Sequence, residues 1–158
     1  MIATGIGWDS HRLVAGRRLV LGGVTLEHDR GLEGWSDADV LTHAVIDALL
    51  GAAGLGDIGE HFPDSDPRFR GADSVELLRD VVALLGAAEV MHVDTTVLME
   101  RPRLGPYRED IRATLAGALG VQLARVNVKA STGEGMGFVG RREGVAALAV
   151  ATLERDAR

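Results

Sequence analysis

The residues best placed to carry out chemistry begin with DSH, where Asp9 and His11 stand one residue apart. On a strand, such residues share a face and lie about 6.6 Å apart along the backbone, a gap that converging side chains can close on one ion. With His43, they would form the nitrogen and oxygen donor set of an open zinc site, whose fourth position is left for water or substrate. By itself, His43 would be interpreted as a solvated histidine or one paired with Asp39 or Asp47 at four-residue steps, and it is the presence of Asp9 and His11 that favours a ligand role.

A second candidate is KASTGEG, residues 129 to 135, which follows a predicted strand and leads into the glycine-rich sequence GMGFVGRR. Glycines can expose backbone N–H groups to phosphate oxygens, and the Thr132 hydroxyl can donate a hydrogen bond. Glu134 can bind a hard cation such as Mg²⁺, and Arg141 can pair with an anion. The segment has neither the Walker pattern nor the dinucleotide-binding fingerprint, so by itself it indicates only a turn.

A third candidate is the acidic sequence GDIGEHFPDSDP, residues 56 to 67. Long ordered loops in compact domains are commonly functional. The competing interpretation is a polar loop whose aspartates form Asx turns around Pro63 and Pro67.

The composition limits the classes of function. A chain of 158 residues suits one domain, residues 1–158, and the absence of cysteine leaves His, Asp and Glu as the metal-binding side chains. The formal charge of -6 argues against binding a nucleic-acid backbone. No apolar run reaches the roughly 18 residues that cross a bilayer, and the start lacks the form of a signal peptide. We therefore expect a cytoplasmic protein without nucleic-acid or membrane partners.

The hydrophobic periodicity predicts the elements that position these residues. Alternation predicts a strand over 2–11 with Asp9 and His11 on its small-residue face, and β-rich runs predict strands over 17–27, 92–100 and 124–131. The second of these strands is expected to bend at Gly22 and Gly23.

Helical spacing predicts a helix over about 37–53 with Ser36 as N-cap, one capped by Ser74, and one that starts at Pro106 and stops at Gly120. Residues 54–73 are expected to be irregular. Residues 145–154 suit a helix or a buried strand, and the alternation of elements predicts one α/β-type layered domain.

Six segments, in this order, point to a known family: DSH at 9 to 11, SDADVLTH at 36 to 43, GDIGEHFPDSDP at 56 to 67, GADS at 71 to 74, VNVKAST at 126 to 132 and GFVGRREG at 137 to 144. Over nearly the whole chain, the sequence resembles the 2-C-methyl-D-erythritol 2,4-cyclodiphosphate synthase family. The resemblance implies an α+β fold, with helices packed on one face of a mixed β-sheet. It also implies a homotrimer, with sheets packed around a three-fold axis and active sites at the interfaces.

The resemblance implies a lyase of the non-mevalonate isoprenoid pathway. Such enzymes convert 4-diphosphocytidyl-2-C-methyl-D-erythritol 2-phosphate to the 2,4-cyclodiphosphate and CMP, by metal-assisted intramolecular attack of the 2-phosphate on the β-phosphorus. Carried over by position, Zn²⁺ or a similar ion would bind Asp9, His11 and His43. Glu134 would bind Mg²⁺ or Mn²⁺ bridging the substrate diphosphate.

The same resemblance places Thr132 and Trp35 at catalytic positions. The substrate-binding positions that it implies are Asp9, Ser10, His11, Trp35, Ser36, Asp57, Ile58, Gly59, Phe62, Pro63, Asp64, Ser65, Asp66, Met99, Arg103, Leu104, Gly105, Ala130, Ser131, Thr132, Gly133, Glu134, Phe138 and Arg141.

Trp35 departs most from the family pattern, because it stands where the family typically has a histidine. An indole N–H can donate one hydrogen bond but carries no positive charge, and loss of a transition-state donor can lower a rate about 10²–10³-fold. The alternative function is therefore a catalytically impaired metal- and nucleotide-binding relative; a third is a zinc hydrolase of phosphate esters. Smaller departures are Ala38 for glycine, Gly133 for threonine and Arg103 for lysine.

Overall fold

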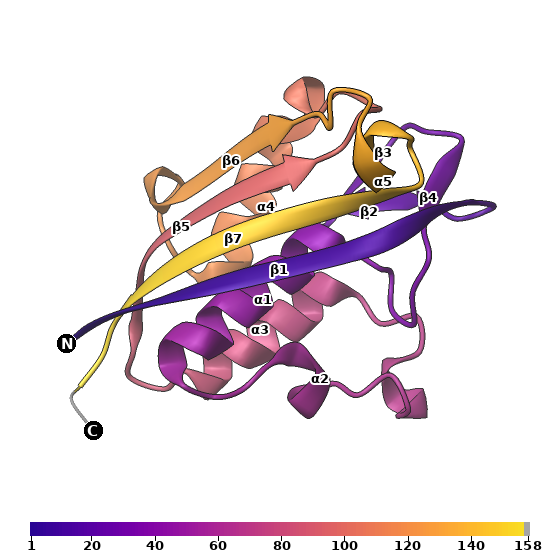
Figure 1. Cartoon of the computed structure of the whole chain (residues 1–158). Helices are drawn as coiled ribbons and strands as arrows, with labels where there is room; N and C mark the ends of the chain where they lie inside the picture. Colours follow the sequence, from indigo (N-terminus) through magenta and orange to yellow (C-terminus); the bar gives the residue numbers. More distant parts are fainter. Residues whose placement is uncertain (157–158) are drawn as a thin grey trace.

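The computed structural model describes residues 1–156, and its framework is a five-stranded mixed sheet (Figure 1). Across the sheet the strands run in the order β4 (Arg30–Leu32), β1 (Ile2–Ala15), β7 (Gly144–Glu154), β5 (Glu89–Leu98) and β6 (Val126–Ser131). β5 and β6 are parallel, and the other neighbouring pairs are antiparallel. A separate hairpin joins β2 (Leu19–Leu21) to β3 (Val24–Leu26).

The main helices cover one face of this sheet, as Figure 1 shows, so the expected α+β arrangement is confirmed. They are α1 (Val40–Ala53), α3 (Ser74–Leu84) and α4 (Arg108–Leu119), with the short α2 (Ile58–His61) and α5 (Gly137–Gly140) in the connections. Short 3-10 turns span Pro67–Phe69, Gly105–Tyr107 and Leu123–Arg125. α1 contacts both β1 and β7 and also packs against α3, which explains why almost all of its residues are buried.

Two glycines on the inner face of β1 allow α1 to approach the strand closely. A Cβ atom at Gly5 would lie 2.1 Å from the Ala48 carbonyl oxygen, and one at Gly7 would lie 1.8 Å from that of Ala44. No side chain fits at either position without moving the helix. The predicted small-residue face of β1 is therefore the surface against which α1 packs, and Asp9 and His11 continue it.

The face of β1 and β7 that points away from α1 carries apolar side chains, and no other element among residues 1–156 covers them. Ile6 is 69% exposed and Trp8 53% exposed, and Ile2 and Val150 are also exposed. Ile6 pairs with Val150 across the two strands, so these side chains form one patch. Within residues 1–156, no helix has the length and apolarity to cross a membrane.

The two ends of the described chain lie side by side, where β1 begins and β7 ends (Figure 1). The Met1 amino group donates to the Arg155 carbonyl oxygen at 2.6 Å, and the Arg155 N–H donates to the Met1 carbonyl oxygen at 2.9 Å. The Arg155 guanidinium also donates to the carbonyl oxygen of Ala53 at the end of α1. Strand and helix ends are thus tied together at this edge.

The predicted helix starts were wrong by one to three residues. α1 begins at Val40 because Asp39, not Ser36, accepts the Thr42 N–H and caps the helix. Asp73 caps α3, so Ser74 is its first residue rather than its cap. The third helix, α4, begins at Arg108 after the 3-10 turn that contains Pro106.

The structure also settles or corrects the remaining predicted elements. The predicted strand over 17–27 is the β2–β3 hairpin, with the expected bend at Gly22 and Gly23, whose φ angles are +56° and +75°. Residues 145–154 are a strand, β7, and the segment 54–73 is not wholly irregular because it contains α2 and a 3-10 turn.

Candidate functional site

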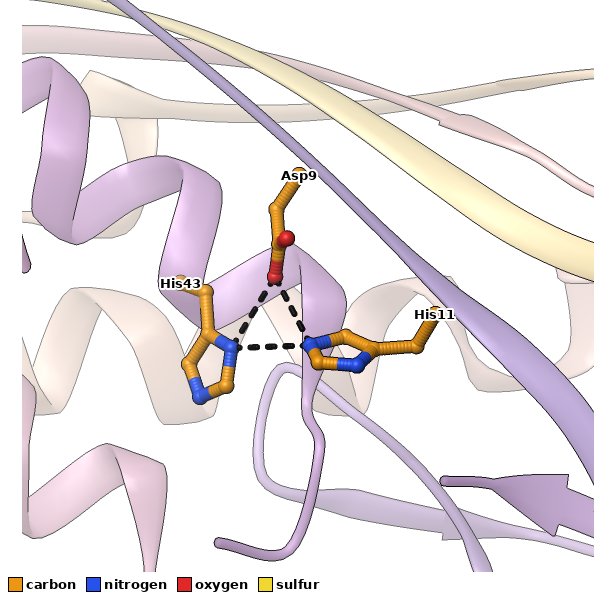
Figure 2. Close-up of side chains that lie close together, drawn as sticks. All are labelled: Asp9, His11 and His43. Carbon is orange, nitrogen blue, oxygen red and sulfur yellow. Dashed lines mark hydrogen bonds and ion pairs between the residues drawn. The ribbon is translucent and has the colours of Figure 1, made fainter. Parts of the chain in front are cut away.

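Asp9, His11 and His43 meet at one point between β1 and α1 (Figure 2). The Asp9 Oδ2 atom lies 3.0 Å from His11 Nε2 and 3.0 Å from His43 Nδ1, and the two imidazole nitrogens are 3.3 Å apart. The convergence expected from the sequence is therefore confirmed. The strand supplies two donors at an interval of two residues, and the buried face of the helix supplies the third.

The donor set fits a zinc ion. Four ligands at the usual 2.0–2.1 Å from tetrahedral Zn²⁺ lie about 3.3 Å from one another. The three observed separations are close to this edge length. Two neutral imidazoles and one carboxylate are also the ligand types that zinc accepts while leaving a fourth position open. The geometry therefore supports a site for a divalent cation with room for an outside ligand.

Both imidazoles are oriented by hydrogen bonds on the side away from the shared point. His11 Nδ1 is 2.8 Å from the Glu33 carbonyl oxygen and must donate its hydrogen to it. Nε2 therefore carries the lone pair that can bind a metal ion. His43 Nε2 is 2.8 Å from the Ser74 hydroxyl, which in turn donates to the Asp37 carboxylate. The chain from Asp37 through Ser74 fixes the tautomer of His43 with Nδ1 free.

The charges of the cluster stabilise one another. Burial raises the pKa of Asp9, but hydrogen bonds and attraction from His11 and His43 outweigh this effect and lower it to about 2. Burial lowers the pKa of His11, but the hydrogen bond and charge of Asp9 outweigh it and raise that pKa. Asp9 is thus a carboxylate at neutral pH and can bind a cation. At His11, protons compete with that cation for the imidazole nitrogen.

The three side chains open into a cavity of about 450 Å³. Of the positions implied by the resemblance, this cavity is lined by Asp9, His11, Trp35, Ser36, Ile58, Gly59, Phe62, Pro63 and Asp64. Gly34, Phe69 and Leu77 also line it and were missed. Phe69 had a usable signal, because an aromatic residue inside a polar loop needs an apolar contact, and it packs edge-on against Phe62 with ring centroids 5.3 Å apart.

Three other positions in this segment contribute differently. Asp57 accepts the Glu60 N–H and caps α2. Asp66 accepts the Arg68 N–H, caps the Pro67–Phe69 turn and forms an ion pair with the Arg68 guanidinium. Ser65 is exposed. None of the three lines the metal cavity, although all belong to residues 56–67, the rim segment, which supplies other lining residues of that cavity.

Two carboxylates that the sequence analysis did not assign to the site, the half-buried Asp47 and the buried Asp39, support its walls. Asp47 accepts the Ile58 N–H at 2.8 Å, which ties α2 to α1, and burial raises its pKa. Asp39 accepts the N–H groups of Gly22 and Gly23 and both the N–H and hydroxyl of Thr42. Asp39 therefore holds the β2–β3 hairpin against the start of α1.

The segment before α1 shows how the sequence departures are accommodated. The Trp35 indole N–H donates to the Asp66 carbonyl oxygen at 3.1 Å. The Ser36 hydroxyl lies 3.2 Å from His43 Nε2 and accepts the Ala38 N–H. Ala38 itself has a φ of +57°, a left-handed conformation that glycine adopts with less strain, and its methyl group is buried.

A second cavity, of about 530 Å³, lies at the end of β5 and β6. It gathers another group of the implied positions: Met99, Arg103, Leu104, Gly105, Ala130, Ser131 and Thr132. Gly133 and Phe138 line a neighbouring hollow of about 200 Å³ with Thr132, and Phe138 lines another with Ser10 and His11. The two large cavities share no lining residue among those described.

The glycine-rich segment differs from the simple phosphate loop that the sequence suggested. The Glu100 carboxylate accepts the N–H groups of Gly133 at 2.7 Å and Gly135 at 3.4 Å. Thr132 donates its hydroxyl to Glu134, whose φ of +52° is unusual for a residue with a side chain. Arg141 pairs with the Glu143 carboxylate. The positive charge of Arg141 and the amides of Gly133 and Gly135 therefore already have partners within the chain.

Comparisons with known proteins agree with this geometry. The model of the YgbB family matches residues 2–154. The chain is 57% identical over 153 residues to the 2-C-methyl-D-erythritol 2,4-cyclodiphosphate synthase of Bordetella petrii, covering 96% of this chain and 94% of that protein. A solved structure of a 2C-methyl-D-erythritol-2,4-cyclodiphosphate synthase in a CDP-bound form superposes with a TM-score of 0.88 at 38% identity, over 96% of this chain and 99% of that one.

A longer relative matches equally well. The chain is 60% identical over 160 residues to the bifunctional enzyme IspD/IspF of Anaeromyxobacter dehalogenans, covering 99% of this chain. It spans 41% of the length of that protein.

Proposed function

Because this chain belongs to the YgbB family, we propose that it is a 2-C-methyl-D-erythritol 2,4-cyclodiphosphate synthase, a lyase of isoprenoid biosynthesis. The observation that carries the proposal is the convergence of Asp9, His11 and His43 on one point in the wall of a cavity of about 450 Å³. The family match and the synthase relatives support the same activity. The substrate would be 4-diphosphocytidyl-2-C-methyl-D-erythritol 2-phosphate, and CMP would be the leaving group. We also propose that residues 1–158 form a single domain.

Two divalent ions would assist the reaction. Asp9, His11 and His43 would hold Zn²⁺, and Glu134 would help hold Mg²⁺ or Mn²⁺. When bound, these ions would neutralise the diphosphate and stabilise the charge that develops as CMP leaves.

The protein's own residues would bring the reacting groups together. Both partners are parts of one substrate, so holding its erythritol arm folded would make the attack of the 2-phosphate on the β-phosphorus favourable by proximity. The apolar rings of Phe62 and Phe69, with Ile58, would exclude water from the cavity and so disfavour simple hydrolysis. The Thr132 hydroxyl would donate a hydrogen bond to the diphosphate.

We further propose a homotrimer with active sites at its subunit interfaces. The metal cavity and the cavity at the end of β5 and β6 share no lining residue, and we propose that the substrate spans these two cavities from neighbouring copies. The exposed apolar patch of Ile2, Ile6, Trp8 and Val150 supports burial of this sheet face between copies. The cytidine would occupy the β5–β6 cavity, in keeping with the CDP named for the solved relative.

Nothing in the comparisons favours the alternative of a catalytically impaired relative, because the matching proteins are named as enzymes of this type. A zinc hydrolase of phosphate esters likewise gains no support.

The test is a reaction of the purified protein with the cytidine diphosphate substrate in the presence of Zn²⁺ and Mg²⁺. We expect CMP and a cyclic diphosphate, identified by ³¹P NMR, and loss of both after chelation with EDTA. Release of a linear product that has incorporated solvent oxygen would instead identify a hydrolase. No CMP release by metal-loaded protein would contradict the proposal.

A further inference from the structure

The indole of Trp35 forms a clasp with the segment that follows the acidic loop. The indole N–H donates to the Asp66 carbonyl oxygen at 3.1 Å. The backbone carbonyl oxygen of Trp35 accepts the Gly71 N–H at 2.8 Å. The Asp37 N–H donates to the Ala72 carbonyl oxygen at 3.0 Å. These three contacts hold the 66–72 backbone beside the residues that precede α1.

The clasp also positions a cation. The Arg70 guanidinium carbon lies 5.5 Å from the centroid of the Trp35 ring, within the range of a cation–π interaction. Among residues 1–156, Arg70 takes part in no ion pair, whereas Arg68 on the same segment is paired with Asp66. The positive charge of Arg70 is therefore available to an outside anion.

The ring beneath this cation is part of the lining of the metal cavity, while Arg70 itself is exposed and lies outside that lining. Trp35 lines the cavity together with His11 and His43, and its side chain is 39% exposed. An indole N–H already bonded to a backbone carbonyl has no second hydrogen to give to a phosphate. The indole can therefore act on an anionic ligand only through what it holds in place.

We propose that Trp35 is a positioning residue and that Arg70, held on its ring face, is the cationic group that meets a phosphate of the substrate at this wall. The inference rests on the proposed function, because it assigns the phosphate contact of the same site. A planar guanidinium stacked on an aromatic ring keeps its N–H edge free for bidentate contact with phosphate oxygens.

The test is a double-mutant cycle on the full-length, metal-loaded protein. Arg70→Gln should raise KM for the substrate about tenfold with kcat within twofold, because the charge acts in binding. Trp35→Ala should raise KM by a similar factor, and the double variant should be no worse than either single variant. Trp35→Phe, which keeps a ring face under Arg70, should recover much of the loss.

Matched controls separate this role from structural damage. Arg68→Gln removes a positive charge from the same segment, but that charge is already paired with Asp66, so KM should stay within twofold of the parent value. Zinc content and the melting temperature should be unchanged in Arg70→Gln. A parent-like KM in Arg70→Gln, or multiplicative effects in the double variant, would overturn the proposal.

A second readout keeps the inference separate from the activity. Calorimetric titration of the zinc-loaded protein with inorganic diphosphate should show about tenfold weaker binding in Arg70→Gln than in the parent or in Arg68→Gln. If the parent protein releases no CMP but this difference appears, the proposed function fails and the role of Arg70 stands. Equal diphosphate affinity in the two arginine variants would refute the role of Arg70 even in an active enzyme.

Discussion

The metal pocket and the glycine-rich segment are both built from residues far apart in the sequence, but they are held in place differently. Asp9, His11 and His43 stand on β1 and α1, and close packing of α1 on Gly5 and Gly7 sets their separation. Thr132 and Glu134 lie on exposed loop backbone shaped by the Glu100 carboxylate. The three donors of the metal pocket come from two packed elements of one chain, whereas Thr132 and Glu134 of the glycine-rich segment are exposed.

This difference suggests that damage to the metal pocket should abolish chemistry, while damage to the glycine-rich segment should mainly weaken binding. The largest expected effect is that of His43→Ala, which removes a buried metal donor. We expect loss of bound zinc and a fall in kcat/KM of about 10³-fold or more. Metal analysis and CMP release measure it, with His28→Ala as the control because His28 lies outside the cluster. Full zinc content in His43→Ala would break the comparison.

The next largest effect tests whether packing of α1 on β1 sets the pocket. Gly7→Ala places a methyl group in contact with the Ala44 carbonyl oxygen and should lower the free energy of unfolding by about 3 kcal/mol. Gly117→Ala, in α4, meets open space and should instead stabilise the protein by about 0.5–1 kcal/mol through helix propensity. Denaturant unfolding measures both. A neutral Gly7→Ala would show that the helix can shift without cost.

A smaller effect on zinc affinity is expected from the hydrogen bond that orients His43. Ser74→Ala removes the hydroxyl that links His43 to Asp37 and should weaken zinc binding about 10–100-fold with the fold intact. Competition with a chromogenic chelator measures the affinity. Ser65→Ala is the matched control, because Ser65 is an exposed serine on the rim segment and should bind zinc like the parent protein.

Zinc affinity should also depend on pH. Asp9 raises the pKa of His11 above its ordinary value of 6.5, so protons compete for Nε2 as the pH falls through that raised pKa. The apparent Kd for zinc should increase about tenfold or more per pH unit below it and level off above it. Asp9, with a pKa of about 2, stays ionised over this range and adds no dependence. A flat profile from pH 5 to 8 would contradict the geometry.

The smallest effect belongs to the glycine-rich segment. Glu100→Ala leaves the Gly133 and Gly135 amides without their acceptor, and we expect KM for the substrate to rise about fivefold with zinc content unchanged. Glu100→Gln keeps a carbonyl oxygen at this position and should behave nearly like the parent. A loss of zinc in Glu100→Ala would show that the two regions are coupled.

Much of the metal site followed from local pattern, because the alternation along β1 put Asp9 and His11 on one face. Their distance from His43 could not be predicted, since it depends on how deeply α1 seats against Gly5 and Gly7. The predicted cap at Ser36 failed because the Ser36 hydroxyl accepts the Ala38 N–H instead, leaving Asp39 to cap the helix.

Other features were ambiguous for physical reasons. The last element suits a helix or a strand because the uncovered face of β7 also carries apolar side chains, Leu148 and Val150, so this strand lacks the polar alternation that usually marks a strand with one exposed face. The role of Glu100 in shaping the glycine-rich segment was invisible because its partners are backbone amides 33 and 35 residues away.

The adjacency of Met1 and Arg155 has a topological consequence. Asp9 lies eight residues along β1 from Met1, roughly 25 Å at the rise of a strand. A short peptide linker from Arg155 to Met1 would join β7 to β1 without moving the metal donors. New ends could then be opened at the exposed, left-handed Gly86, between α3 and β5, giving a circular permutant in which β1 and β7 become one continuous hairpin.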